Sequence, residues 1–180
     1  MKLMFIADIH GSAKYLEKAL SRFREEKPER LVILGDILYH GPRNPIPDGY
    51  DPEKVIELLN PLKDRLLAVR GNCDSEVDQM VLDFPMSGDY LQLMIEDKEF
   101  YLSHGHLYNN ELPQTIKEGS IYVQGHTHVP MVKLIKGCWH INPGSVTLPK
   151  EGHKRTYGTY ENNSFSIKTI DGDEYMNSML

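Results

Sequence analysis

Three short apolar runs, separated by two segments of helical character, fill the first 72 residues and constrain the fold more than any other feature. The runs KLMFIA (2–7), RLVILGD (30–36) and RLLAVRGN (65–72) have the length and continuity of buried strands. After the first run, apolar residues recur at helical spacing: Leu16, Ala19, Leu20 and Phe23. A second helix, opened by Asp51 and Pro52, is expected over 51–62. This alternation predicts right-handed crossovers and a largely parallel sheet.

The rest of the chain changes character. Seven further strand-like runs begin at residues 90, 99, 120, 131, 138, 156 and 164, with little helix between them. Their short connections favour mostly antiparallel pairing. Two sheets packed face to face, with helices outside, accommodate both halves of the sequence. No linker-like segment or internal repeat divides the chain, so we expect one domain spanning residues 1–180.

Composition excludes several classes of protein. The formal net charge of −6 argues against a protein that coats nucleic acid, because such proteins are normally basic. Two cysteines, Cys73 and Cys138, are too few for a disulfide framework and favour a reducing compartment. No run has the character of a signal peptide or the roughly 18 apolar residues of a membrane span. We therefore expect a cytoplasmic protein without a membrane partner.

Side chains that can bind metal ions follow five of the predicted strands. They occur in ADIHG, LGDI, RGNCD, LSHGH and QGHTH, and the donors are Asp8, His10, Asp36, Asn72, His104, His126 and His128. In open α/β sheets, ligands bind outside the carboxyl ends of the strands, where these groups would converge. Taken singly, an Asp or Asn at a strand end is more often a turn residue or a helix cap. Their joint placement at successive strand ends is what predicts a metal site.

The number of donors predicts the number of ions. His126 and His128 are two residues apart, so in an extended segment both imidazoles point to the same side. One octahedral ion takes six ligands and a catalytic ion keeps open positions, so seven donors are too many for one ion. Two ions sharing a bridging carboxylate use all seven, as in two-metal phosphoester hydrolysis. Imidazole, carboxylate and amide oxygen suit Mn²⁺, Fe²⁺, Ni²⁺ or Zn²⁺, and the lack of a thiolate argues against structural zinc.

In this order, the five motifs resemble the calcineurin-like metallophosphoesterase superfamily, whose pattern is D-x-H, G-D, G-N-x-D, H and G-H-x-H. The resemblance covers roughly residues 3–150, and GNCD and INPGSV look like the small YfcE-type phosphodiesterases. It implies a four-layer αββα sandwich of two mixed sheets flanked by helices. It also implies two divalent ions, with Mn²⁺ expected and Ni²⁺, Fe²⁺ or Zn²⁺ as alternatives. The first ion would be held by Asp8, His10, Asp36 and His128, and the second by Asp36, Asn72, His104 and His126.

One position departs from the family pattern. Many members carry a histidine after the motif asparagine, thought to protonate the leaving group, and here that residue is Cys73. A neutral thiol with a pKa of about 8.5 is a poor acid for this purpose. Arg43, in a long proline-rich loop, and His106 are candidates for substrate contact, although Arg43 is equally well explained as a solvated loop residue. Asp74 is expected to orient a ligand histidine.

The function expected is hydrolysis of a small phosphodiester by a water or hydroxide that bridges the two ions. The missing motif histidine favours diesters or activated esters over monoesters. A phosphomonoesterase with the same site remains an alternative, as does a non-catalytic scaffold, because one retromer subunit uses this fold with degraded metal motifs. Every ligand position is filled here, which favours the enzyme. A homo-oligomer is compatible with the sequence.

Overall fold

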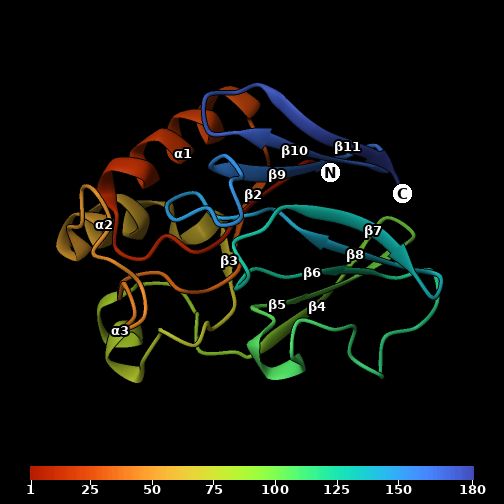
Figure 1. Cartoon of the computed structure of the whole chain (residues 1–180), viewed down its shortest axis with the longest axis horizontal. Coiled ribbons are helices and arrows are strands. Elements are labelled where there is room, and N and C mark those ends of the chain that lie inside the picture. Colours follow the sequence, from red (N-terminus) through yellow and green to blue (C-terminus); the bar gives the residue numbers. More distant parts are fainter.

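The computed structural model describes all 180 residues and contains two β-sheets packed face to face (Figure 1). The first sheet is formed by β1 (Leu3–Ile6), β2 (Arg30–Ile33), β3 (Leu66–Ala68), β9 (Thr156–Glu161), β10 (Ser164–Thr169) and β11 (Glu174–Met179). The second is formed by β4 (Tyr90–Ile95), β5 (Lys98–Ser103), β6 (Ile121–Val123), β7 (Met131–Ile135) and β8 (Cys138–Asn142). Their spatial orders are β11-β10-β9-β1-β2-β3 and β4-β5-β6-β8-β7. Both sheets are mixed, as the family resemblance implies.

Helices cover the outer face of the first sheet. α1 (Ala13–Glu26) begins at Ser12, whose side chain accepts a hydrogen bond from the Tyr15 amide. α2 (Pro52–Leu59) begins at Asp51, which accepts from the Lys54 amide, and it continues as the 3₁₀ helix η1 (Asn60–Arg65). The helix start expected at Asp51 and Pro52 is therefore confirmed. None of the helices is both long enough and apolar enough to cross a membrane.

The core has two layers because side chains alternate along each strand. On β1, Met4 and Ile6 belong to the cluster that packs under the helices, together with Leu20 of α1. Leu3 and Phe5 belong to the cluster between the two sheets. All four strand residues are buried, which explains why this run is apolar without interruption.

Pairing in the second sheet differs from the mostly antiparallel arrangement that we expected. β4 pairs with β5 and β7 with β8 in antiparallel fashion, but β5–β6 and β6–β8 are parallel. The segment between β5 and β6 carries the chain back along the sheet, so both strands run in the same direction. It contains the 3₁₀ helix η2 (His106–Tyr108) and lies on the outer face of the second sheet, where Tyr108 and Pro113 line a pocket with Tyr101 and Tyr122.

Two elements were not expected from the sequence. α3 (Glu76–Val81) buries none of its residues, and Val77 and Met80 are 65% and 81% exposed, so no apolar periodicity marks it. β11 is an edge strand of intermediate and exposed residues, and it lacks the apolar alternation that identifies a half-buried strand.

Glu26, at the end of α1, joins the helix to three parts of the first sheet. Its carboxylate accepts hydrogen bonds from Lys2, Lys168 and Tyr157, and its side chain is 14% exposed. Burial raises the pKa of this carboxyl, but the hydrogen bonds from Lys168, Lys2 and Tyr157 outweigh it and lower the pKa to about 2.

We expect Glu26→Gln to lower the free energy of unfolding by about 1–2 kcal/mol at pH 7. Because the folded pKa lies below the ordinary value of 4.5, the contribution is complete above pH 4.5 and is lost as the pH falls towards 2. Urea unfolding at pH 7 and pH 3 measures this difference. Glu25→Gln is the matched control, because the side chain of Glu25 is 56% exposed and forms an ion pair with Arg22 at the surface. Equal effects of both substitutions at pH 7 would contradict the assignment.

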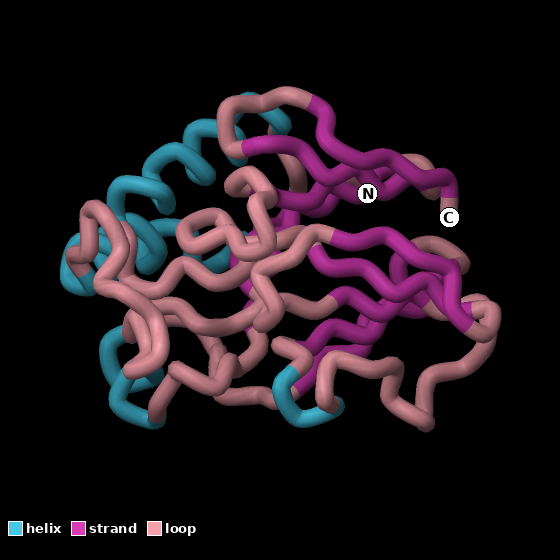
Figure 2. The backbone as a smooth tube through the Cα atoms, in the orientation of Figure 1, coloured by secondary structure: helices cyan, strands magenta, loops and turns pink.

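The loops that follow β1, β2, β3, β6 and β8 gather on the side of the molecule away from the two chain termini (Figure 2). This follows from the topology, because the carboxyl ends of parallel strands lie at one edge of a sheet. The donor motifs of the sequence all lie in or beside these loops.

Candidate metal centre

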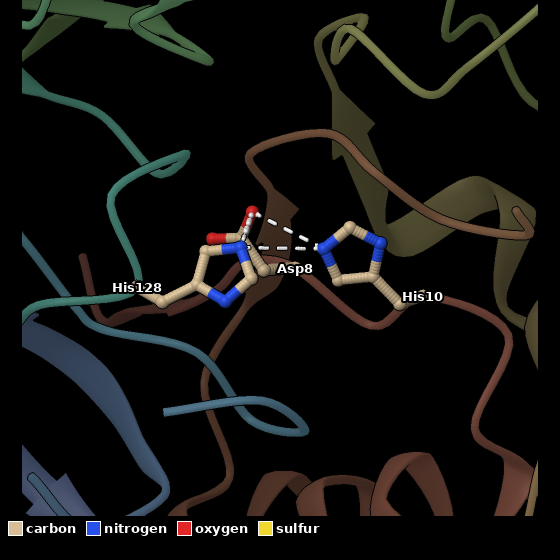
Figure 3. Close-up of side chains that lie close together, drawn as sticks. All are labelled: Asp8, His10 and His128. Carbon is tan, nitrogen blue, oxygen red and sulfur yellow. Dashed lines mark hydrogen bonds and ion pairs between the residues drawn. The ribbon is translucent and has the colours of Figure 1, made fainter. Parts of the chain in front are cut away.

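Asp8, His10 and His128 form the first group of donors, although they lie in two segments far apart in the sequence (Figure 3). Nε2 of His128 is 3.2 Å from Oδ1 of Asp8 and 3.3 Å from Nε2 of His10. All three side chains are almost fully buried. Oδ1 of Asp8 has no hydrogen-bond donor, which is costly for a buried carboxylate oxygen unless a cation completes its surroundings.

The hydrogen bonds of the two imidazoles fix their tautomers. Nδ1 of His10 lies 3.0 Å from the Tyr39 carbonyl, and Nδ1 of His128 lies 2.5 Å from the Leu148 carbonyl. A carbonyl only accepts, so both Nδ1 atoms carry a proton, and each neutral ring has its lone pair on Nε2. Two lone pairs 3.3 Å apart repel each other. A metal ion between or beside them removes the repulsion, and a carbonyl partner on the other nitrogen is typical of metal-binding histidines.

Asn72, His104 and His126 form a second group around Asp36. Nε2 of His104 is 3.1 Å from Oδ1 of Asn72, 3.2 Å from Nδ1 of His126 and 3.4 Å from Oδ2 of Asp36. Nδ1 of His104 donates to the Leu34 carbonyl, so the neutral form of this ring directs its lone pair into the group. In that form, acceptor atoms again face one another.

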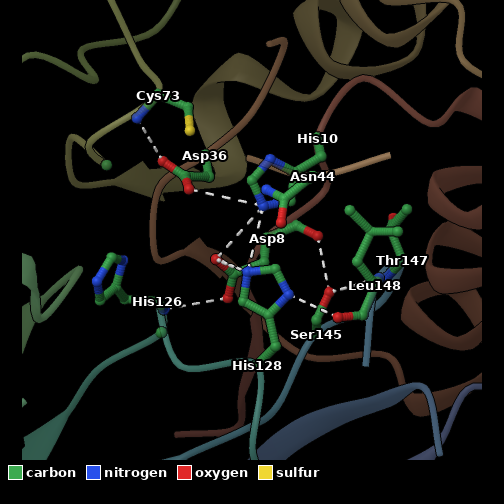
Figure 4. Close-up of polar contacts among 12 residues, drawn as sticks. Asp8, His10, Asp36, Asn44, Cys73, His126, His128, Ser145, Thr147 and Leu148 are labelled. Carbon is green, nitrogen blue, oxygen red and sulfur yellow. Dashed lines mark hydrogen bonds and ion pairs between the residues drawn. The ribbon is translucent and has the colours of Figure 1, made fainter. Parts of the chain in front are cut away.

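Asp36 lies next to His10 (Figure 4) and contacts both groups. Its Oδ2 is 3.6 Å from Nε2 of His10 in the first group and 3.4 Å from Nε2 of His104 in the second. Its Oδ1 accepts a hydrogen bond from the Cys73 amide at 2.8 Å. A carboxylate so placed can contact two ions at once.

The backbone holds five of the donors in the left-handed region, at φ values that non-glycine residues seldom adopt. They are Asp8 (57°), His10 (49°), Asp36 (55°), His126 (69°) and His128 (61°). Such conformations persist only where surrounding contacts fix them. Here the amide of His126 donates to Oδ2 of Asp8, and the hydroxyl of Ser145 donates to the Asp8 carbonyl. Strain concentrated at these donors is typical of a functional site.

Asp74 has a different role from the one expected. It contacts no histidine, and its carboxylate instead accepts hydrogen bonds from the backbone amides of Asp36, Ile37 and Gly71 at 2.7–2.8 Å. Burial raises the pKa of this carboxyl to about 6, although the amide donors oppose the shift. Asp74 therefore fixes the turn that carries Asp36 rather than the orientation of an imidazole.

The charges of Asp36 and its neighbours shift the pKa values of the imidazoles. Burial alone would lower the pKa of His104, but the hydrogen bond and charge of Asp36 raise it to about 9. Burial and the neighbouring His104 lower the pKa of His126 to about 4. Burial opposes ionisation of Asp36, yet the adjacent histidines hold its pKa well below the usual range.

We expect protein stripped of metal by a chelator to bind Mn²⁺ more tightly as the pH rises from 6 to 9. An ion can bind His104 only after its proton leaves, so below its pKa of about 9 each pH unit lowers the affinity about tenfold. His126, with a pKa of about 4, is already neutral in this range and adds nothing to the pH dependence of binding. Titration calorimetry in buffers of different ionisation enthalpy measures both the affinity and the proton release. A constant affinity from pH 6 to 9 would contradict this.

A polar cleft of about 350 Å³ opens over the two groups. Arg43, the candidate for substrate contact, lines this cleft. Cys73, which stands at the position of the family's histidine, lines it too. His106 does not line it and instead lies behind, with its ring centroid 5.4 Å from that of His104. The further lining residues are Gly41, Pro42, Asn44, Asn110, Thr127 and Lys150. Thr127 lies within the QGHTH motif, whereas the others lie in loops outside the five motifs, so no motif marked them.

Two packed sheets whose strand ends gather carboxylates and imidazoles beneath a polar cleft define the class of metallophosphoesterases. The chain belongs to the calcineurin-like phosphoesterase superfamily, whose domain profile matches residues 1–164. It is 46% identical over 171 residues to Phosphodiesterase YfcE of Escherichia coli K12, covering 95% of this chain and 93% of that protein.

Solved structures agree with this assignment. The structure of YfcE, a phosphoesterase from E. coli, superimposes with a TM-score of 0.96 at 44% identity and covers 99% of both chains. Vps29 from Entamoeba histolytica, solved with Zn²⁺, has a TM-score of 0.63 at 19% identity, over 99% of this chain and 98% of that one. The second likeness shows the fold alone.

Proposed function

We propose that this protein is a phosphodiesterase that depends on two divalent metal ions. The observation that carries the proposal is the position of Asp36, whose Oδ2 lies within 3.6 Å of a ring nitrogen in each of the two donor groups. The 46% identity to Phosphodiesterase YfcE supports the choice of reaction.

Each ion has four proposed ligands. Asp8, His10, Asp36 and His128 would hold the first, and Asp36, Asn72, His104 and His126 would hold the second, with Asp36 shared. Nitrogen and oxygen donors of intermediate softness suit Mn²⁺, our first choice, and also Ni²⁺, Fe²⁺ or Zn²⁺. When bound, such ions acidify water and stabilise charge on the phosphoryl oxygens.

The chain's own residues would complete the site. Arg43 lines the cleft and offers a planar fork that matches two phosphate oxygens. Its side chain makes no hydrogen bond or ion pair with the protein, so it is free to bind substrate. In the proposed direct hydrolysis, water rather than a side chain attacks the phosphate that the cleft holds in place.

Cys73 stands where many relatives in the superfamily have a histidine, but its chemistry differs. Burial and the charge of Asp36 raise the pKa of the thiol to about 12, so it is neutral at physiological pH. A neutral thiol protonates a leaving group poorly, which favours substrates whose leaving group departs without a proton.

We expect Cys73→Ala to change kcat for bis(4-nitrophenyl) phosphate by less than about threefold, because 4-nitrophenolate departs without protonation. The measurement is steady-state hydrolysis with Mn²⁺, with Cys138→Ala as the control, since Cys138 is buried away from the cleft. A loss of a hundredfold or more in Cys73→Ala alone would instead assign an acid–base role to the thiol.

The experiment that tests the proposed function is a panel of phosphomonoesters and phosphodiesters assayed with Mn²⁺, Ni²⁺, Mg²⁺ and Zn²⁺. We expect metal-dependent hydrolysis of diesters that exceeds hydrolysis of matched monoesters. Preferred hydrolysis of monoesters would identify a phosphomonoesterase. Metal binding without any hydrolysis would support a scaffold on the same fold.

Three further expectations from the sequence stay proposals. We propose that residues 1–180 act as one domain, because the buried cluster between the sheets takes residues from both of them. A cytoplasmic location and a homo-oligomeric state remain predictions, and the small diester substrate is the partner that the polar cleft favours.

A further inference from the structure

The charge of the cleft is unusual for a protein with a formal net charge of −6. Of its twelve lining residues one is hydrophobic, and Asp36 is the one carboxylate. Two cationic side chains line it, Arg43 and Lys150. Neither takes part in an ion pair with a carboxylate of the protein. The cleft therefore presents two uncompensated positive charges.

These two cations reach the cleft from different loops. Lys150 lies beside the first donor group, because its amide donates to the His128 carbonyl at 3.4 Å and Leu148 accepts from the His128 ring. Arg43 lies in the loop that packs on Cys73, where a Cβ added to Gly41 would lie 2.8 Å from Sγ. Cys73 and Leu148 appear on different sides of Asp8 in Figure 4. Arg43 and Lys150 thus line the same cleft from two separate loops.

A simple diester does not match this charge. Two divalent ions exceed the charge of Asp8 and Asp36 by roughly two units, and Arg43 and Lys150 add roughly two more. A phosphodiester carries about one negative charge, and Arg43 with the ions already suffices to bind it. Lys150 then has no anionic partner: it pairs with no carboxylate of the protein, and a diester with neutral arms offers no second negative charge.

We propose that Lys150 selects phosphodiesters in which one arm carries a further anionic group, a carboxylate or a phosphate. This inference rests on the proposed function and narrows its substrate class. The ammonium group of a lysine is a mobile point charge on a flexible stem, so it suits a terminal anion on an arm better than the fixed geometry of the reacting phosphate. The polar lining agrees with an arm of this kind and disfavours a large apolar one.

The test uses three diesters that share a 4-nitrophenyl leaving group. The second arm is propyl, 2-carboxyethyl or 2-phosphoethyl, so the neutral and anionic arms are similar in length. For the full-length protein loaded with Mn²⁺, kcat/KM for the anionic arms should exceed that for the propyl ester. Lys150→Gln should lower the ratio of kcat/KM for an anionic arm to kcat/KM for the propyl arm about tenfold. It should change kcat/KM for the propyl ester itself less than twofold. The comparison of the two anionic arms distinguishes a carboxylate from a phosphate.

Lys154→Gln is the matched control, because Lys154 is exposed on the same loop but lies outside the cleft. It should leave the ratio unchanged. Equal ratios in the wild-type protein and Lys150→Gln, with the propyl ester still hydrolysed, would overturn the inference and leave the proposed function intact.

Binding gives a readout that does not depend on turnover. Calorimetry with 3-phosphonopropionate and with propylphosphonate should show about tenfold weaker binding of the first probe in Lys150→Gln and no change for the second. If no diester is hydrolysed, the proposed function fails, and this pair of affinities still decides the role of Lys150. Equal binding of both probes by the wild-type protein and the variant would contradict it.

Discussion

We expect Asp36→Asn to lower kcat/KM for bis(4-nitrophenyl) phosphate by at least about a thousandfold and to reduce bound metal from the proposed two ions per chain to one or fewer. The amide keeps the shape of the side chain but has one neutral oxygen in place of a shared carboxylate. Oδ2 lies 3.6 Å from His10 and 3.4 Å from His104, so both donor groups lose their common negative charge. Losing an ion removes several kcal/mol of charge stabilisation, which corresponds to this loss of rate.

Steady-state hydrolysis and elemental analysis of the purified variant measure the two effects together. Asp89→Asn makes the same chemical change at a surface carboxylate that pairs with Arg70, and we expect its activity to stay within about twofold of the wild-type value. Circular dichroism shows whether the variant is folded. Full activity in folded Asp36→Asn would be incompatible with a shared carboxylate.

Gly71→Ala is expected to reduce kcat/KM by about a hundredfold or more, although residue 71 offers no side chain to the reaction. A Cβ at this position would lie 2.1 Å from Oδ1 and 2.4 Å from the amide nitrogen of Asp36. Oδ1 of Asp36 accepts a hydrogen bond from the Cys73 amide, and the Asp36 amide donates one to Asp74. Because both atoms are held in this way, the added Cβ displaces the carboxylate of Asp36 itself. A displacement of about 1 Å at a reacting centre is enough for a loss of this size.

Gly88→Ala is the control for this substitution. The Gly88 carbonyl accepts from the Arg70 amide, directly beside Gly71, but a Cβ there would meet its nearest neighbour at 3.7 Å. Neither glycine has a positive φ, so backbone strain does not distinguish them. Activity, metal content and thermal unfolding of both variants separate a local effect on Asp36 from a loss of the fold. Equal activities in the two variants would show that the close contact is unimportant.

The sequence located the donor groups because β topology restricts where strand ends can lie. Asp8, Asp36 and His126 each follow a short buried strand, and parallel strands deliver such residues to one edge of a sheet. The structure brings all seven predicted donors into the two groups around Asp36.

Other features depended on contacts that no local pattern encodes. Asp74 lies two residues after Asn72, but its partners are amides of a distant turn at Asp36 and Ile37. Lys150 reaches the cleft because its loop is tied to His128, and no motif marks that contact. Parallel pairing of β5 with β6 depends on the course of a long connection rather than on the composition of either strand. These are tertiary effects, and periodicity describes only local structure.

An anomalous difference map of Mn²⁺-loaded crystals would show whether two metal ions share Asp36. We predict two peaks roughly 3.5–4 Å apart. One should lie within bonding distance of Asp8, His10 and His128, and the other of Asn72, His104 and His126, with Asp36 contacting both. A single peak at full Mn²⁺ occupancy, or two peaks of which only one contacts Asp36, would contradict the account.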